Sequence, residues 1–247
     1  MKTLQESKEI TNFIQEKINE PSDAFHEKMD LVSKKICELS KNQLGDQINQ
    51  NTMTIDFPLH LNEKDLNNAM NRLVLSAIYV FYSTGMNDFF LLHGITSSQA
   101  GKMIFGQLDS PQDKSQFIRH LWRGLFTTYI CQGLPVLKPP STISYQIENE
   151  EERWKQVIQK GLQSNEEHIT KVIFACKKEN DHYHEQDEEN KKLFPKQLLL
   201  LTCEGLIKSS GINGEHFRNG VGIFNNPLQE NLFLSLFKKI FGTKKKK

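Results

Sequence analysis

The sequence predicts an all-α protein: a single multi-helix domain preceded by a polar helical N-terminal appendage. Apolar residues recur at helical spacing along most of the chain, strand-like alternation is nearly absent, and capping and stop signals separate the helical segments. With 247 residues, 37% of them hydrophobic, the chain is long enough to bury one well-formed core. We expect an appendage and linker over residues 1–54, the helical domain over residues 55–241 and a basic tail over residues 242–247.

The N-terminal appendage is expected to contain two polar helices, each with a thin apolar stripe. The first, over residues 2–19, ends before Pro21 because proline cannot continue the helical hydrogen-bond ladder. The second covers residues 24–39. Residues 43–54 are a polar linker to the folded domain.

The first helix of the domain should begin after Asn62, which can cap it while Asp65 completes a box-like start. It should run to about Ser83. Gly85 then suits the left-handed backbone conformation in which many helices end. Residues that can cap a second helix follow Gly85 within three positions.

Asn87 or Asp88 is expected to cap the second helix, which should reach about Phe105. The sequence Asp109-Ser110-Pro111 signals a third start. Its helix carries a broad apolar stripe and ends at the Gly-Leu-Pro sequence of residues 133–135.

Further helices are expected over residues 150–163, 165–178, 195–210 and 228–241. Ser164-Asn165-Glu166-Glu167 has the pattern of a capping box, Pro195 suits a first helical turn, and Gly211 can end that helix. The charged residues 179–191 are expected to form a loop.

The best place to look for chemistry is the polar corner at residues 83–88 and the apolar helix after it. Asp88 is better placed to cap that helix than to act as a base. His93 should share a face with Phe89, Thr96 and Ser97, and a histidine with hydroxyl neighbours can serve as a general acid or base. The alternative is a core histidine whose two nitrogens are satisfied by Thr96 and a backbone carbonyl.

Residues 88–98, Asp-Phe-Phe-Leu-Leu-His-Gly-Ile-Thr-Ser-Ser, resemble the D-F-F-L-[LM]-H-x-[VL]-T-S-S signature of the questin oxidase-like family. Residues 82–85 and 121–135 are similar to that family as well, and His168-x-x-Lys171 is a weaker echo. These strings fall between residues 71 and 176, in the family's order. Nothing in the chain matches the family's N-terminal H-H-x-x-H helix, so the resemblance covers only the C-terminal half.

The resemblance implies a helical oxidoreductase that opens an anthraquinone-type ring by Baeyer–Villiger-type oxygen insertion. The substrate would be a small aromatic or polyketide-like molecule of secondary metabolism, and NADPH is the cofactor that the family suggests. The sequence has no Gly-x-Gly-x-x-Gly fingerprint for a dinucleotide, and the cofactor stays unknown. Whether this partial member is an active enzyme also stays open.

For such a reaction His93 is the candidate base, with Thr96 beside it. Arg119 and Arg123 could hold a phenolate or oxyanion, unless both are surface residues with buried stems. His168 and Lys171 are second candidates. The alternative to an enzyme is a non-catalytic helical scaffold.

Other features exclude several functions. The net charge is +1 and no basic patch is interleaved with aromatic residues, so no nucleic acid is expected as partner. His182 and His184 with their acidic neighbours have metal-ligand types, but we interpret this segment as a solvated loop and expect no metal.

The location is predicted to be cytoplasmic. The first residues lack the apolar core of a secretory signal, and no apolar run is long enough to span a bilayer. The four cysteines are far apart and are interpreted as buried free thiols of a reducing compartment. Residues 228–247, an amphipathic helix with a lysine tail, favour a core-capping role; weak contact with a membrane surface is the alternative.

Overall fold

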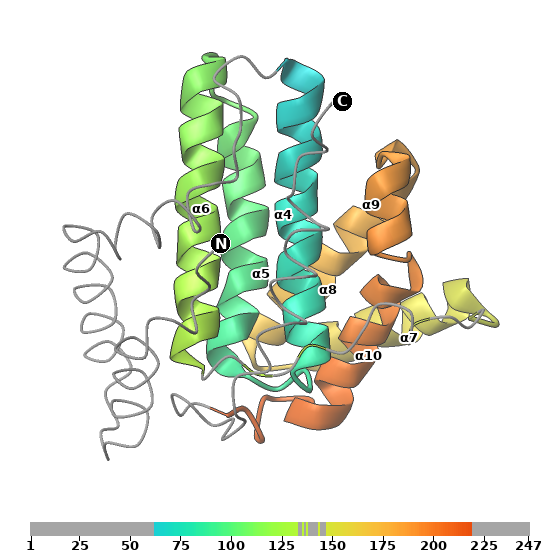
Figure 1. Cartoon of the computed structure of the whole chain (residues 1–247). Coiled ribbons are helices and arrows are strands. Elements are labelled where there is room, and N and C mark those ends of the chain that lie inside the picture. Colours follow the sequence, from blue (N-terminus) through green and yellow to red (C-terminus); the bar gives the residue numbers. More distant parts are fainter. Residues whose placement is uncertain (1–61, 133–134, 136, 138–142, 144–146, 219–247) are drawn as a thin grey trace. The chain divides into compact units, whose positions relative to one another are not determined.

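The computed structural model describes residues 62–132, 135, 137, 143 and 147–218 (Figure 1). The chain divides into two compact units. One comprises residues 1–60, 115–136 and 220–247, and the other comprises residues 61–114 and 137–219. The two predicted N-terminal helices, the predicted last helix, and the boundaries at residues 54 and 241 lie outside the described residues.

The described part of the chain is helical, and this confirms the predicted all-α class. It contains no strand, only one isolated bridge between Asp88 and Arg218. The elements are α4 (Glu63–Ser83), α5 (Phe89–Phe105), α6 (Pro111–Cys131), α7 (Glu150–Gln163), α8 (Glu167–Asp181), the 3₁₀ helix η3 (Tyr183–Glu185), α9 (Glu188–Leu193) and α10 (Gln197–Ser210). No helix in these ranges is both long and apolar enough to cross a bilayer.

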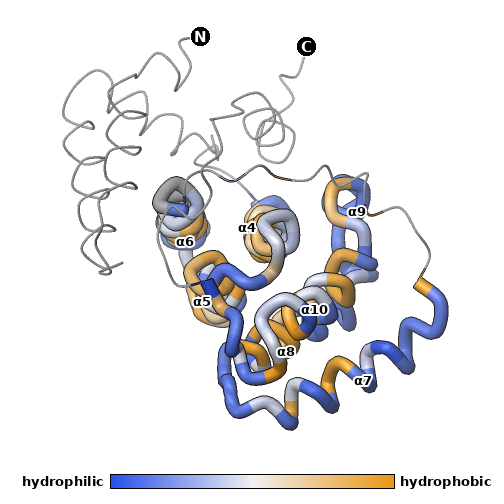
Figure 2. Tube along the Cα trace, turned by 90° about the horizontal axis from the view of Figure 1, so that it is seen from below, coloured by the Kyte–Doolittle hydropathy of each residue, from blue (hydrophilic) through white to orange (hydrophobic). Residues whose placement is uncertain are grey.

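The larger unit is built on the hairpin of α4 and α5. α4 also packs against α10, and α8 packs against α5, α7 and α10, so that α8 and α10 close the core beside the hairpin (Figure 1). Figure 2 shows α7 as a largely hydrophilic helix at the outer edge, whereas α5 and α8 carry more hydrophobic residues. The core is richest along α4, where residues 73–81 are buried almost without interruption.

The start and end of α4 follow from local signals, as predicted. The Asn62 side chain accepts a hydrogen bond from the Asp65 N–H at 3.0 Å, which satisfies one of the free donors of the first turn. The helix ends at Ser83. Gly85, with φ +101°, then turns the chain where a side chain would be strained.

The corner between α4 and α5 is locked by α10. Met86 also has a positive φ, of 61°, and its carbonyl accepts a hydrogen bond from the Ser209 hydroxyl at 2.9 Å. The Met86 side chain fills the space above Gly205, where an added Cβ would lie 2.1 Å from the Met86 sulfur. A larger residue at that position of α10 would therefore have to displace the flexible end of the Met86 side chain.

The predicted capping box before α8 is wrong. The Ser164 hydroxyl bonds the backbone of Glu166, accepting from its N–H at 3.0 Å, and makes no bond to the first turn of the helix. Glu166 is the cap, because its own carboxylate accepts from the His168 N–H at 3.0 Å. The helix therefore starts at Glu167, later than predicted, and it continues to Asp181.

The predicted loop over residues 179–191 is also wrong, because most of it is helical. It contains the end of α8, then η3, and then α9, which starts where the Asp187 side chain accepts from the Asn190 N–H at 2.6 Å. Two carboxylates of this stretch, Asp187 and Glu189, pair with Arg72 of α4, and Glu179 pairs with Lys102 of α5. Those partners are far away in sequence, so local composition could not reveal the helix.

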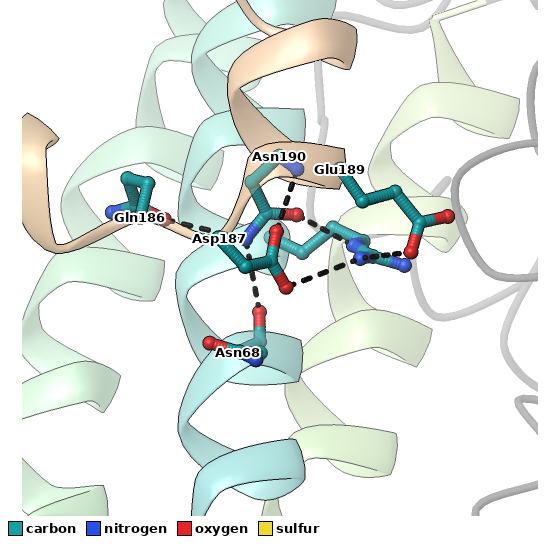
Figure 3. Close-up of polar contacts among 6 residues, drawn as sticks. Asn68, Gln186, Asp187, Glu189 and Asn190 are labelled. Carbon is teal, nitrogen blue, oxygen red and sulfur yellow. Dashed lines mark hydrogen bonds and ion pairs between the residues drawn. The ribbon is translucent and has the colours of Figure 1, made fainter.

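A buried polar cluster fastens α9 to α4 (Figure 3). Arg72 donates through Nε to the Asn190 side-chain oxygen at 2.7 Å and forms ion pairs with Asp187 and Glu189 at 3.8 and 3.2 Å. Asn190 is fully buried, and its amide also donates to the Asn68 carbonyl at 3.4 Å. Buried polar groups are tolerated because each has a partner.

α6 begins in the larger unit, and its residues 115–131 belong to the smaller one. The Ser110 hydroxyl accepts from the Asp113 N–H at 3.3 Å, so the predicted start signal is confirmed. Ile118, Trp122 and Tyr129 are buried at helical spacing, and the Tyr129 hydroxyl donates to the Pro135 carbonyl just beyond the helix.

Candidate active site at the first turns of two helices

The structure brings together His93 and His168, which are 75 positions apart in the sequence. His93 lies in the second turn of α5 and His168 in the first turn of α8, and the centroids of their rings are 4.9 Å apart. Phe89 touches both, with centroid distances of 4.7 Å to His93 and 4.9 Å to His168. The two imidazoles and this phenyl ring pack together. We call the imidazoles of His93 and His168 the histidine pair.

The packing of α5 on α8 holds the histidine pair in place. Farther along these helices, Lys102 of α5 donates to Glu179 of α8 at 2.7 Å, and the Glu179 side chain is almost fully buried. A buried carboxylate without its cation would be costly, so this ion pair favours one register of the two helices. The register in turn sets the distance between the two imidazoles.

The hydrogen bond of His93 determines which of its nitrogens is available. Its Nδ1 lies 2.7 Å from the Phe89 carbonyl oxygen, one turn back on α5. A carbonyl only accepts, so Nδ1 carries the proton and Nε2 of the neutral ring keeps its lone pair. His93 is exposed. This geometry differs from that of the alternative core histidine, because the Thr96 hydroxyl bonds the His93 carbonyl and not its ring.

His168 is oriented in the same way by a carboxylate. Its Nδ1 contacts a carboxylate oxygen of Glu166, which also accepts the His168 backbone N–H. These bonds, the backbone one first, lower the pKa of the Glu166 carboxyl, so that it is ionised at neutral pH. The carboxylate keeps the proton on Nδ1, and Nε2 of His168 is again the free nitrogen.

Both Nε2 atoms therefore lack a hydrogen-bond partner among the residues that the structure describes. Such nitrogens can take a proton from a substrate or give one back, and imidazole is also a common metal ligand. In the described ranges, no group of three or more histidine, cysteine or carboxylate side chains is arranged to hold a metal ion.

Aromatic rings form the walls of the site. Phe90 stands edge-on to Phe89 at 5.8 Å, and Phe217, from the segment that follows α10, packs on Phe89 at 5.7 Å. Apolar walls exclude water and strengthen the electrostatic interactions inside a site.

Asp88 lies at the N-terminal end of α5, directly before Phe89. It is fully buried and caps α5 by accepting from the N–H groups of Phe90 and Leu91 at 3.0 and 2.9 Å, as predicted. Burial raises the pKa of Asp88 to about 6, although these N–H groups and the guanidinium of Arg218 oppose the rise. Burial also lowers the pKa of Arg218.

The structure shows no contact of the remaining predicted site residues with the two imidazoles among the residues that it describes. Lys171, exposed on α8, pairs with Glu167 at 2.9 Å, and Thr96 is bonded to its own helix. Arg119 and Arg123 are on α6 in the smaller unit. Their part in the site is an untested prediction.

The other candidates from the sequence have separate roles. His182 caps the end of α8, with Nδ1 2.8 Å from the Lys178 carbonyl, and His184 is exposed beside Glu185. Cys176 and Cys203 are buried free thiols, as predicted, whereas the side chains of the other two cysteines lie outside the description.

Sequence reasoning missed Glu166 and Phe217. Glu166 was assigned to a capping box, although a carboxylate two residues before a histidine at a helix start can reach the ring. No local signal marks Phe217, which joins the site through tertiary folding alone.

The fold and the site define a helical protein in which an exposed histidine, His93, and a half-buried one, His168, lie side by side against an aromatic ring. A family model described as Questin oxidase-like matches residues 4–176. The match covers more than half of the chain, so the protein belongs to the questin oxidase-like family. The matched range begins at residue 4, well before the strings between residues 71 and 176 that resemble the family, and it includes both His93 and His168. Searches of curated proteins and of solved structures found no match.

Proposed function

We propose that the protein is an oxidoreductase that inserts oxygen into the ring of a quinone or polyketide-like substrate. The observation that carries this proposal is the histidine pair, which presents two free Nε2 atoms beside an aromatic wall. Family membership supports the reaction class. The buried free thiols Cys176 and Cys203 favour a reducing compartment, so we place the activity in the cytoplasm.

In this proposal His93 is the base. Its Nε2 takes the proton of a phenolic hydroxyl on the substrate, and the resulting anion is more readily oxidised than the phenol. His168, oriented by Glu166, returns a proton to the oxyanion that forms when the ring carbonyl is attacked. The Phe89 ring, which stands edge-on to both imidazoles, would contact the planar substrate beside the two nitrogens.

The oxygen balance requires two electrons from outside the substrate. NADPH, which the family resemblance suggests, would supply them, so that molecular oxygen yields the inserted atom and water. The described residues offer no Gly-x-Gly-x-x-Gly turn for its pyrophosphate. Thr96, Lys171, Arg119 and Arg123 remain candidates for binding the substrate anion.

The test is oxygen consumption and product mass with a panel of anthraquinones, with and without NADPH. His93→Ala should lower the rate by about 10²- to 10⁴-fold, the usual contribution of a general base, while the melting temperature stays nearly unchanged because the ring is exposed. His182→Ala is the matched control, since His182 is also exposed and bonded to the carbonyl one turn back. Equal turnover in His93→Ala and wild type would contradict the proposal.

A wild-type protein without turnover under every condition would favour the non-catalytic scaffold. Binding of the full chain to anionic vesicles, compared with a chain lacking residues 228–247, would then test weak contact with a membrane surface. Those residues lie outside the described part of the chain, so membrane contact stays an untested alternative.

The role of Glu166 can be tested without a substrate. Glu166→Ala removes the acceptor at His168 Nδ1, so the ring should lose its fixed tautomer, whereas Glu166→Gln keeps an oxygen there and should preserve it. Long-range ¹⁵N–¹H NMR spectra of the imidazole report the tautomer directly. An unchanged tautomer in Glu166→Ala would show that the carboxylate does not orient this ring.

A further inference from the structure

Residues 211–218, which follow α10, contact the start of α8 and the corner before α5. They have no role in the reaction proposed above. We call this segment the strap. It begins at Gly211, whose φ of +80° turns the chain out of α10, and it ends at Arg218. The family match ends at residue 176, so the strap lies beyond it.

One part of the strap is fastened to the start of α8. The Asn213 side-chain oxygen accepts from the Asn165 N–H at 3.1 Å. Gly214 has a φ of +72°, and a Cβ added there would lie 3.0 Å from Cγ of Glu166. The strap therefore passes directly beside the carboxylate that orients His168.

The end of the strap is fastened to the corner before α5. The Arg218 N–H donates to the Asn87 carbonyl at 2.8 Å, and the Phe89 N–H donates to the Arg218 carbonyl at 3.0 Å. The Arg218 guanidinium donates to the Thr84 carbonyl at 2.8 Å and attracts the buried Asp88 carboxyl. Three hydrogen bonds and a charge thus hold this end.

Between these two attachments the strap carries Phe217, which lies next to the histidine pair. Its ring is half-buried and packs on Phe89, the ring that touches both imidazoles. It also packs on Gly214, where an added Cβ would lie 2.6 Å from the ring. The Phe217 ring is therefore packed between Phe89 and the backbone of the strap at Gly214.

We propose that Phe217 is a specificity-determining residue: the strap holds its ring as a wall of the histidine pair and limits the size of the planar molecule that reaches both imidazoles. Arg218 is the positioning residue that keeps the wall in place. The substrate class rests on the proposed function, but the restriction of access rests only on the contacts of the strap.

Access can be measured without turnover. Diethyl pyrocarbonate acylates unprotonated imidazole nitrogens, and mass spectrometry of peptides gives a rate for each histidine. Phe217→Ala and Arg218→Ala should each raise the rate at the half-buried His168 several-fold, and the rate at the more exposed His93 by a smaller factor. His182, exposed at the far end of α8, is the internal reference and should not change.

Two further variants keep the test decisive. Phe174→Ala removes a phenylalanine that is 59% exposed and should leave the rates at both site histidines unchanged. Phe217→Leu keeps apolar bulk but loses the ring, and it serves if Phe217→Ala unfolds and all histidines react alike. Folded Phe217 variants with wild-type rates at His93 and His168 would overturn the proposal.

The limit on the size of the bound molecule is tested in a separate experiment. A two-ring naphthoquinone and a three-ring anthraquinone are compared as protectors of His93 against acylation. In Phe217→Ala the protection by the anthraquinone should improve relative to that by the naphthoquinone. An unchanged ratio would overturn the size limit, whereas a shifted ratio without any turnover would support the wall and argue against the proposed oxidation.

Discussion

Asp88 offers the sharpest quantitative prediction, because one substitution separates its charge from its role as a cap. Asp88→Asn keeps an oxygen that can accept from the Phe90 and Leu91 N–H groups but removes the buried charge. Burial raises the pKa of this carboxyl from its ordinary 3.8 to about 6. At about 1.4 kcal/mol for each pKa unit, ionising Asp88 costs about 3 kcal/mol more in the folded protein than in the unfolded chain.

The sign of the pH dependence follows from proton binding. Between about pH 4 and pH 6 the folded protein holds the proton on Asp88 while the unfolded chain has released it. The free energy of unfolding therefore falls as the pH rises through this range, and the loss is complete above about pH 6. Glu166, whose pKa is lowered, has the opposite effect, but it contributes equally to wild type and variant.

Urea unfolding of both proteins at intervals from about pH 4 to pH 7 measures the effect. The stability of wild type relative to Asp88→Asn should fall by about 3 kcal/mol across this range. Asp88→Ala controls for the cap, since it should cost about 1 kcal/mol more than Asp88→Asn at every pH. A difference between wild type and Asp88→Asn that is constant or rises with pH would refute the reasoning.

Two further predictions concern the packing around the site and the polar cluster on α4. Gly205→Ala would place a Cβ 2.1 Å from the Met86 sulfur, so the end of the Met86 side chain must shift. The gain of about 1 kcal/mol that alanine usually brings to a helix interior should then be absent in thermal unfolding, and a full gain would mean that Met86 moves freely. Asn190→Ala removes the buried acceptor of Arg72 and should cost about 2–3 kcal/mol in urea unfolding. The exposed partner Glu189, replaced by alanine, should cost less than about 1 kcal/mol, and equal losses would contradict this ranking.

The helix boundaries show how much local sequence can predict. Asn62, Asp88 and Ser110 each carry a side-chain oxygen that bonds a nearby N–H, so the starts of α4, α5 and α6 were predictable. The start of α8 was not. Ser164 and Glu166 both have capping side chains, and the choice between them depends on the ring of His168.

Long-range partners explain the other differences. The charged stretch that forms α9 has a loop-like composition, and its helix is held by Arg72 of α4, more than a hundred residues earlier. A salt bridge of this kind leaves no periodic signal in either segment. Local propensity is a weak guide wherever a tertiary contact supplies the stabilising partner.

By itself, the sequence determined the helical class, most helix ends and the family, and it made His93 a candidate, because periodicity, caps and motifs are local properties of the chain. Only the tertiary structure decided that His168 lies beside His93, that Glu166 orients it and that Phe217 closes one wall. These groups come from α5, α8 and the strap. Their meeting depends on the packing of α5 on α8, including the Lys102–Glu179 ion pair, and no spacing along the chain encodes that distance.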